Sequence, residues 1–425
     1  MARTVAGLSE GTRVTDYISL GVITKMFPLH HVQSILRETG RESIRQRQLP
    51  AHVVFYYVIA LALFSQVSYG EVLRCLVEGL GWLGDSSVRR IRCTGRSAIS
   101  MARTRLGAEP LRRMVEAAIR PIADRKTRGA WYRDWRLVSI DGTTLDLADT
   151  VANEEAFGRP GASRGKSAFP QLRMVSLVEN GTHVLFATKW GSYNDSENTL
   201  ARPVLSHLEA GMLCLADRGF YGYAIWRRTA SMGADLLWRM KKNAILPCDR
   251  RLADGSYLSR IYPSTKDRRH DRNAIVVRVI EYALEGIEDG EPLYRLITTV
   301  LDDAKAPAED LAALYHDRWE IENVFDEFKT HLRGRQAVLR SKTPELVEQE
   351  LYGFLLAHFA IRGLMHEAAL KGDLDPDRLS FIHTVRVVRR KVPAFAAIPP
   401  SALADAPRGR TRRDSRRARS LQPGT

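Results

Sequence analysis

The segment RLVSIDGTTLDL, residues 136–147, marks the point where the hydrophobic pattern of the chain changes from that of helices to that of β-strands. Its apolar half ends in Asp141-Gly142. We therefore expect a buried strand that ends in an acidic turn and is followed by a second short strand. A carboxylate in this place is either a turn residue or part of a site built at the edge of a sheet.

Elements on the C-terminal side of this segment complete a sheet. Two apolar runs, residues 172–178 and 183–190, flank Asn180-Gly181, which is a strong β-hairpin signal. A helix is expected over 197–210, and MLCLAD, residues 212–217, reads as a buried central strand. Antiparallel strands followed by alternating helices and strands predict a mixed sheet with helices packed on it. The later elements of this pattern are a helix over Ala224–Ala230, a strand over Asp235–Met240 and a β-rich insertion over about 245–305.

Residues before about 125 have helical patterns. Pro50 begins an apolar helix, and a second apolar helix is expected over Val72–Leu83. A third helix begins near Ser97, and its basic side chains resemble those of the second helix of a helix-turn-helix motif. This resemblance predicts that Arg103 and Arg105 face DNA.

The composition favours a polyanionic partner and more than one domain. The chain has 425 residues, 44% of them hydrophobic, and a formal net charge of +15. Its last segment, residues 407–425, is rich in arginine and has a single acid, which is typical of a disordered tail that binds phosphates. The expected domains are a helical domain at 1–125, a mixed α/β domain at 126–395 and the tail at 396–425.

The cysteines and the termini indicate the compartment. The four cysteines are far apart and have no metal-ligand spacing, so we expect neither disulfides nor a structural zinc site. The N-terminus lacks the apolar core of a signal peptide, and the longest apolar run, residues 53–64, is too short to span a bilayer. These features predict a soluble cytoplasmic protein with no membrane partner.

The segment ALYHDRWEIENVFDEFKTHL, residues 313–332, predicts a helix with a specialised polar edge. On a regular α-helix Tyr315, Arg318, Glu322 and Lys329 would share an arc of about 60° beside an apolar stripe. An acid between two cations suits a metal ion held beside a phosphate. The alternative is a set of solvated ion pairs three and four residues apart.

Three acids could form one metal site. Asp141 and Asp217 each follow an apolar strand, and with Glu322 they would offer the hard oxygen ligands that Mg²⁺ prefers. Three shared carboxylates suit two metal ions acting on a phosphodiester. Asp326 is the nearest rival of Glu322. Further acids are expected to be turn or cap residues, namely Asp146, Asp149, Asp195 and Glu197.

These motifs together resemble a known family. DGTT at 141–144, LADRGFYGY at 215–223 and Tyr-x2-Arg-x3-Glu-x6-Lys at 315–329 resemble the insertion-sequence DDE transposases, and more narrowly the insertion-element-four type. The resemblance runs from about Leu20 to Ala369. It implies an α/β fold with a ribonuclease-H-like mixed sheet, a β-rich insertion between the second Asp and the Glu, and an N-terminal all-helical DNA-binding domain.

The resemblance also implies roles for single residues. Asp141, Asp217 and Glu322 match the catalytic acids that bind two Mg²⁺ ions, with Mn²⁺ as a substitute. Trp319 matches an aromatic residue that helps to hold a base out of the duplex, although a core tryptophan is an equal alternative. The residues matched to phosphate contacts are Tyr315, Arg318 and Lys329. Further contacts to the DNA backbone are expected from Arg218, Arg239 and Lys241.

The implied function is cut-and-paste transposition of a bacterial insertion sequence. The protein would act as a homodimer on double-stranded DNA, cleave strands at terminal inverted repeats through a hairpin, and join the ends to target DNA. When bound it would be associated with the nucleoid. Two alternatives stay open: a catalytically retired DNA-binding remnant, and a metal-dependent nuclease that does not join strands.

Overall fold

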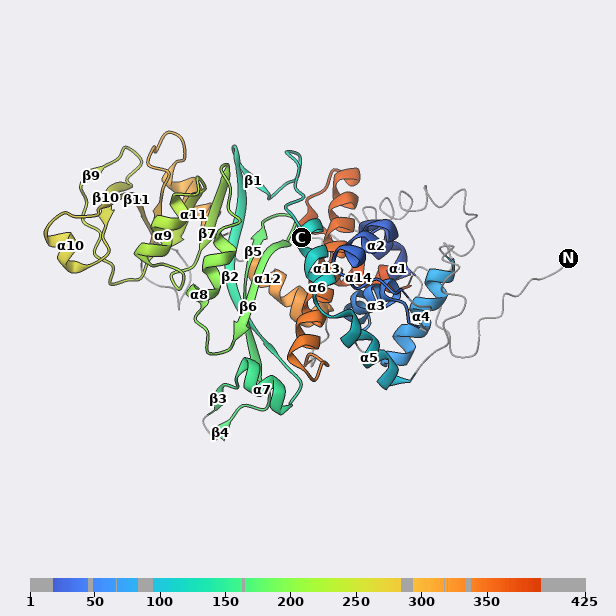
Figure 1. The fold of residues 1–425 in the computed structure, drawn as a ribbon. Helices are drawn as coiled ribbons and strands as arrows, with labels where there is room; N and C mark the ends of the chain where they lie inside the picture. The colour runs from blue at the N-terminus through green and yellow to red at the C-terminus, as the bar shows by residue number, and fades with distance from the viewer. Residues whose placement is uncertain are drawn as a thin grey trace. The chain divides into compact units, whose positions relative to one another are not determined.

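The structure is a computed structural model, and it describes residues 18–44, 49–65, 67–82, 95–162, 165–283, 293–316, 318, 320–332 and 338–390. The chain forms two compact units (Figure 1). Unit 1 comprises Met1–Ile119, Asp146–Glu155 and Asp326–Thr425, and unit 2 comprises Arg120–Leu145 and Ala156–Phe325. Unit 1 thus combines described residues from before Arg120 with described residues from after Phe325, and the expected domains at 1–125 and 126–395 stay a prediction. The tail expected at 396–425 lies outside the described residues.

Unit 1 is helical, and its centre is a pair of apolar helices. α3 (Ala51–Leu63) begins directly after Pro50, as predicted, and is buried along almost its whole length. α13 (Pro344–Gly372) packs against it, and Gly353 permits this close approach because a Cβ there would lie 2.7 Å from the Val58 carbonyl oxygen. The other elements of this unit are α1 (Ile18–Met26), α2 (Leu29–Glu38), α4 (Tyr69–Trp82), α5 (Arg96–Leu106), α6 (Glu109–Ala118), η4 (Glu327–Leu332), η5 (Pro376–Arg378) and α14 (Phe381–Arg390). α7 (Val151–Phe157) begins in unit 1.

Unit 2 is built on one ten-stranded mixed sheet with the order β6-β5-β2-β7-β8-β12-β11-β10-β9, and β1 pairs with β2. Its centre is parallel, because β2 pairs with β7 and β7 with β8 in the same direction. The strands are β1 (Trp131–Tyr132), β2 (Trp135–Asp146), β5 (Gln171–Glu179), β6 (Val184–Ser192), β7 (Met212–Ala216), β8 (Asp235–Arg239), β9 (Arg250–Arg251), β10 (Tyr257–Ile261), β11 (Ile275–Tyr282) and β12 (Tyr294–Thr298). A separate small pair consists of β3 (Gly161–Ala162) and β4 (Gly165–Lys166). The predicted mixed sheet is confirmed, and the β-rich insertion extends it.

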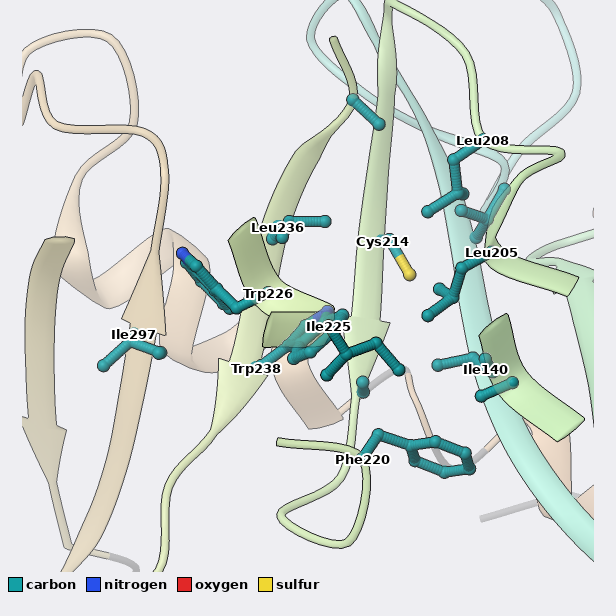
Figure 2. Packing of buried hydrophobic residues seen from close by; sticks show 14 of the residues in the cluster. Ile140, Leu205, Leu208, Cys214, Phe220, Ile225, Trp226, Leu236, Trp238 and Ile297 are labelled. Carbon is teal, nitrogen blue, oxygen red and sulfur yellow. The ribbon is translucent and has the colours of Figure 1, made fainter. Parts of the chain in front are cut away.

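Helices cover both faces of the central strands. On one face α8 (Glu197–Leu205) and α9 (Tyr223–Ala230) pack on alternate residues of β2, β7 and β8, and Figure 2 shows Leu205, Cys214 and Trp238 in this layer. The rings of Trp226 and Trp238 meet edge to face at 5.2 Å between centroids. On the other face the remaining residues of these strands pack on α11 (Ala308–His316). α10 (Thr265–Arg269) lies in the insertion.

The hairpin between β5 and β6 forms where Asn180-Gly181 predicts it. Gly181 has a φ of +75°, which side chains rarely adopt, and a Cβ there would lie 2.6 Å from the backbone nitrogen of Ala130. Both constraints select glycine at this position.

Gly181→Ala should therefore destabilise the protein by about 3 kcal/mol. The alanine would have a strained positive φ, and its Cβ would clash with the backbone near Ala130. Urea unfolding of the two forms measures the difference. A change below about 1 kcal/mol would show that the hairpin relaxes around the methyl group.

Two expectations about the motif segments are wrong. β2 is a single strand of 12 residues, without an acidic turn at Asp141. Its partner β7 ends at Ala216, opposite Ile140, but β2 still has β5 as its second neighbour and continues. The segment 313–332 is not one regular helix, since α11 ends at His316, α12 spans Glu320–Asp326 and η4 is a π-helix. Within the described ranges no helix is long and apolar enough to cross a membrane.

Candidate active site

Three adjacent parallel strands bring polar residues to one level of the sheet. Ile140 pairs with Ala216, and Ala216 pairs with Trp238, so the next residues, Asp141, Asp217 and Arg239, lie side by side. Neighbouring strands are about 4.8 Å apart. Because Ile140, Ala216 and Trp238 face the layer of α8 and α9, strand alternation directs the three polar residues to the opposite face, on the side of α11. Asp141 and Asp217 therefore occupy neighbouring positions on this face of the sheet.

Arg318 links a third acid, Glu322, to Asp141. Only 6% of Arg318 is exposed, and it lies between α11 and α12. Its Nη1 is 3.5 Å from Oδ2 of Asp141, and its Nη2 is 3.8 Å from Oε1 of Glu322. One buried guanidinium thus pairs with two of the predicted catalytic acids, one from the sheet and one from α12.

Tyr315 lies on the same face and is 5% exposed. Its hydroxyl donates a hydrogen bond of 3.3 Å to the carbonyl oxygen of Ala216, the residue before Asp217. Burial raises the pKa of the Tyr315 hydroxyl above its usual range. Tyr315 therefore fixes the end of β7 in this structure.

Several charged groups lie near Asp141. Burial raises the pKa of Asp141 to about 6, while the Gly142 N–H at 2.7 Å and Arg318 act in the opposite direction. The negative charges of Glu197 and Asp217 are smaller contributions to the raised pKa of Asp141. Glu197 lies close to the backbone of Gly142, since a Cβ added to Gly142 would be 2.9 Å from Oε1 of Glu197. Glu197 lies in the first turn of α8, directly after the N-cap Ser196, and its charge reaches Asp141 through the fold.

Asp217 holds an oxygen that suits a cation. Its Oδ1 is buried, and none of the described residues donates a hydrogen bond to it. Nη1 of Arg239 lies 3.9 Å from this oxygen, and the guanidinium of Arg239 lies over the ring of Tyr294 at 4.5 Å from its centroid. A buried anionic oxygen without a donor is costly, which makes Asp217 a fitting ligand for a bound cation.

The donor set fits Mg²⁺, although the acids are not gathered around one point. No three His, Cys, Asp or Glu side chains in the described part of the chain are placed to hold a metal ion as they stand. The guanidinium of Arg318 pairs with both Asp141 and Glu322. Carboxylate oxygens and the donor-free oxygen of Asp217 are nonetheless the ligand type that Mg²⁺ selects.

The other predicted DNA-binding residues fall into several environments. Arg218 and Lys241 are exposed in the loops after β7 and β8, and Arg105 is exposed on α5. Lys329 is half-buried on η4 in unit 1. Trp319 lies outside the described residues. Asp326, the rival of Glu322, pairs instead with His331 at 2.8 Å.

The prediction that Arg103 faces DNA is wrong. Arg103 is 2% exposed, and its guanidinium donates to Gln349, Ser341 and the carbonyl oxygen of Leu346 at 2.8–3.1 Å. The apolar face of α5 turns Arg103 toward α13, whereas Arg105 on the same helix is exposed. Arg103 is thus a structural residue of unit 1.

Comparison with known proteins identifies the family. A family model described as a transposase DDE domain matches residues 133–360, more than half of the chain, and one for the N-terminal part of insertion element 4 transposases matches 17–116. The chain belongs to the insertion-element-four type of DDE transposases. The resemblance predicted from the motifs is confirmed.

Individual relatives agree with this membership. The transposase InsG for insertion sequence element IS4 of Escherichia coli K12 is 29% identical over 407 residues, which cover 92% of this chain and 85% of the relative. The putative transposase InsZ of the same strain is 26% identical over 52% of this chain and 71% of its own length. A piggyBac transposase synaptic complex with hairpin DNA matches 93% of this chain and 86% of its own, but its TM-score of 0.44 and identity of 10% are too low to establish a shared fold.

Proposed function

We propose that this chain is the cut-and-paste transposase of an insertion sequence. It cleaves DNA strands at the terminal inverted repeats of the element, passes through a hairpin, and joins the freed 3′-ends to target DNA. The observation that carries the proposal is that Asp141 on β2 and Asp217 directly after β7 lie side by side, and that Arg318 pairs with both Asp141 and Glu322. The sheet that bears them is of the ribonuclease-H-like type.

Asp141, Asp217 and Glu322 would hold two Mg²⁺ ions, for which Mn²⁺ substitutes. Bound there, the ions would supply an activated water for strand hydrolysis and charge stabilisation for the leaving oxygen. The chain itself contributes the position of the carboxylates, which Tyr315 and Arg318 fix from α11 and the turn after it. No covalent protein intermediate is required, because catalysis rests on positioning and charge.

Cationic side chains at the strand ends would bind the DNA backbone. Arg218 and Lys241 follow β7 and β8 and are exposed, so both would reach phosphates next to the acids. Trp319 would stack on a base held out of the duplex. Lys329 and Arg105 in unit 1 would add backbone contacts. Two transposon ends must be handled together, which favours a homodimer on DNA.

The test of this function is incubation of the purified protein with Mg²⁺, duplexes carrying the ends that flank its own gene, and a supercoiled target plasmid. The expected result is cleavage at the element boundary, a hairpin on a denaturing gel, and ends joined to the plasmid. Tight binding without cleavage would instead indicate a DNA-binding remnant. Cleavage without joining would indicate a nuclease.

Lys329→Ala should weaken binding to the terminal repeat at every salt concentration. Loss of one phosphate contact should reduce the slope of log K against log[salt] by about 0.9. Fluorescence anisotropy at four or five salt concentrations measures the slope. An unchanged slope would remove Lys329 from the DNA interface.

A further inference from the structure

The π-helix that carries Lys329 is held in an unusual register. η4 spans the six residues Glu327–Leu332, and π-helices are rare and concentrated at functional sites. On a regular helix, side chains three and four apart are neighbours. Here Asp326 and His331, five residues apart, are in contact, with 2.8 Å between Oδ2 and Nε2. This spacing matches the i→i+5 repeat of a π-helix, so the side chains follow the same register as the backbone.

A buried charge cluster fixes the start of the π-helix. Glu327 is 8% exposed, and both of its oxygens accept hydrogen bonds from Arg362 of α13, which is 2% exposed. His358, one turn earlier on α13 and 1% exposed, places its Nε2 3.4 Å from Oε2 of Glu327. A paired guanidinium and carboxylate require a defined geometry, and burial makes any departure from it costly.

Neighbouring contacts hold the rest of the segment. Phe328 is fully buried, and its ring lies 5.8 Å from that of Phe354 on the same face of α13. At the other end the Ser65 hydroxyl donates to the carbonyl oxygen of Leu332 at 3.3 Å. Lys329 follows Glu327 and Phe328 directly, so its direction is set by the register that these contacts impose.

We propose that Glu327, paired with Arg362 and His358, is a positioning residue for Lys329. The buried ion pair selects the π-helical register, and the register decides where the ammonium group of Lys329 is presented to DNA. In a regular α-helix the same residue would point in a different direction around the axis. This inference rests on the proposed role of Lys329 as a phosphate contact.

The test replaces the ion pair with apolar side chains in the full-length protein. Glu327→Leu combined with Arg362→Met removes both charges together, a change that buried ion pairs usually tolerate without loss of stability. The expected result is a melting temperature within a few degrees of the native value and a salt slope of terminal-repeat binding that falls by about 0.9, as in Lys329→Ala. Adding Lys329→Ala to the double variant should change the slope no further.

The control is Lys25→Gln combined with Glu367→Gln, which removes an exposed ion pair between α1 and α13 with the same net charge change. Its salt slope should equal that of the native protein. Arg362→Lys gives a second measure if the double variant fails to fold, since it keeps the charge but loses the paired hydrogen bonds, and its slope should be intermediate.

Four outcomes are decisive. A folded double variant with the native slope, or one in which Lys329→Ala still lowers the slope, would overturn the positioning role of Glu327. A native salt slope in Arg362→Lys would also overturn the positioning role of Glu327. A native slope in the single variant Lys329→Ala would instead overturn the proposed DNA contact, which separates the two failures.

Discussion

Glu322→Gln should abolish strand cleavage, lowering its rate by about 1,000-fold or more, while terminal-repeat binding stays within about twofold of native. The amide has the shape of the carboxylate but lacks the charge that a metal ligand needs. Its side chain is 48% exposed, so stability should change little. Denaturing gels measure cleavage, and anisotropy measures binding with the same duplex.

Glu309→Gln is the matched control for this change. Glu309 is exposed in the first turn of α11, at the end remote from Tyr315, and the substitution removes the same charge from the same unit. Its cleavage rate should equal the native rate. Loss of binding in Glu322→Gln, or native cleavage by it, would contradict the assignment of Glu322 as a catalytic acid.

Arg103→Ala should destabilise the protein by about 3 kcal/mol, because it removes three buried hydrogen bonds and leaves the Gln349 side-chain oxygen without its charged donor. The salt slope of DNA binding should not change, since the guanidinium is turned into unit 1. Chemical denaturation gives the first quantity, and anisotropy gives the second.

Arg105→Ala, on the same helix, should affect DNA binding and not stability. Arg105 is exposed, so its removal should alter stability by less than about 0.5 kcal/mol and lower the salt slope by about 0.9. If Arg103→Ala instead lowered the salt slope of DNA binding and left the stability of the protein unchanged, Arg103 would be a residue of the DNA interface.

The central sheet and its acids could be predicted because their signals are local. The continuous apolar run before Asp217 marks a buried strand, and its parallel pairing with β2 sets Asp141 and Asp217 at neighbouring positions. Asn180-Gly181 indicates its hairpin through backbone conformation alone. The apolar helix after Pro50 is equally clear, since nearly every residue in it is buried.

Other features depend on tertiary contacts that no short window of sequence contains. A regular helical repeat over 313–332 would align Lys329 with Glu322. The structure instead has a π-helix over Glu327–Leu332, where Glu327 pairs with Arg362, 35 residues away. Arg103 has the sequence context of a recognition helix, and only its distant partners on α13 show that it is buried. Glu197 approaches Asp141 because Gly142 leaves room for it.

The most direct test of the central claim is equilibrium binding of Mn²⁺ to the full-length protein, followed by electron paramagnetic resonance. If Asp141, Asp217 and Glu322 serve one metal site, then Asp141→Asn, Asp217→Asn and Glu322→Gln should each weaken Mn²⁺ binding by about tenfold or more, whereas Glu309→Gln should not. Native Mn²⁺ affinity in all three variants would contradict a shared metal site, and with it the proposed mechanism of strand cleavage.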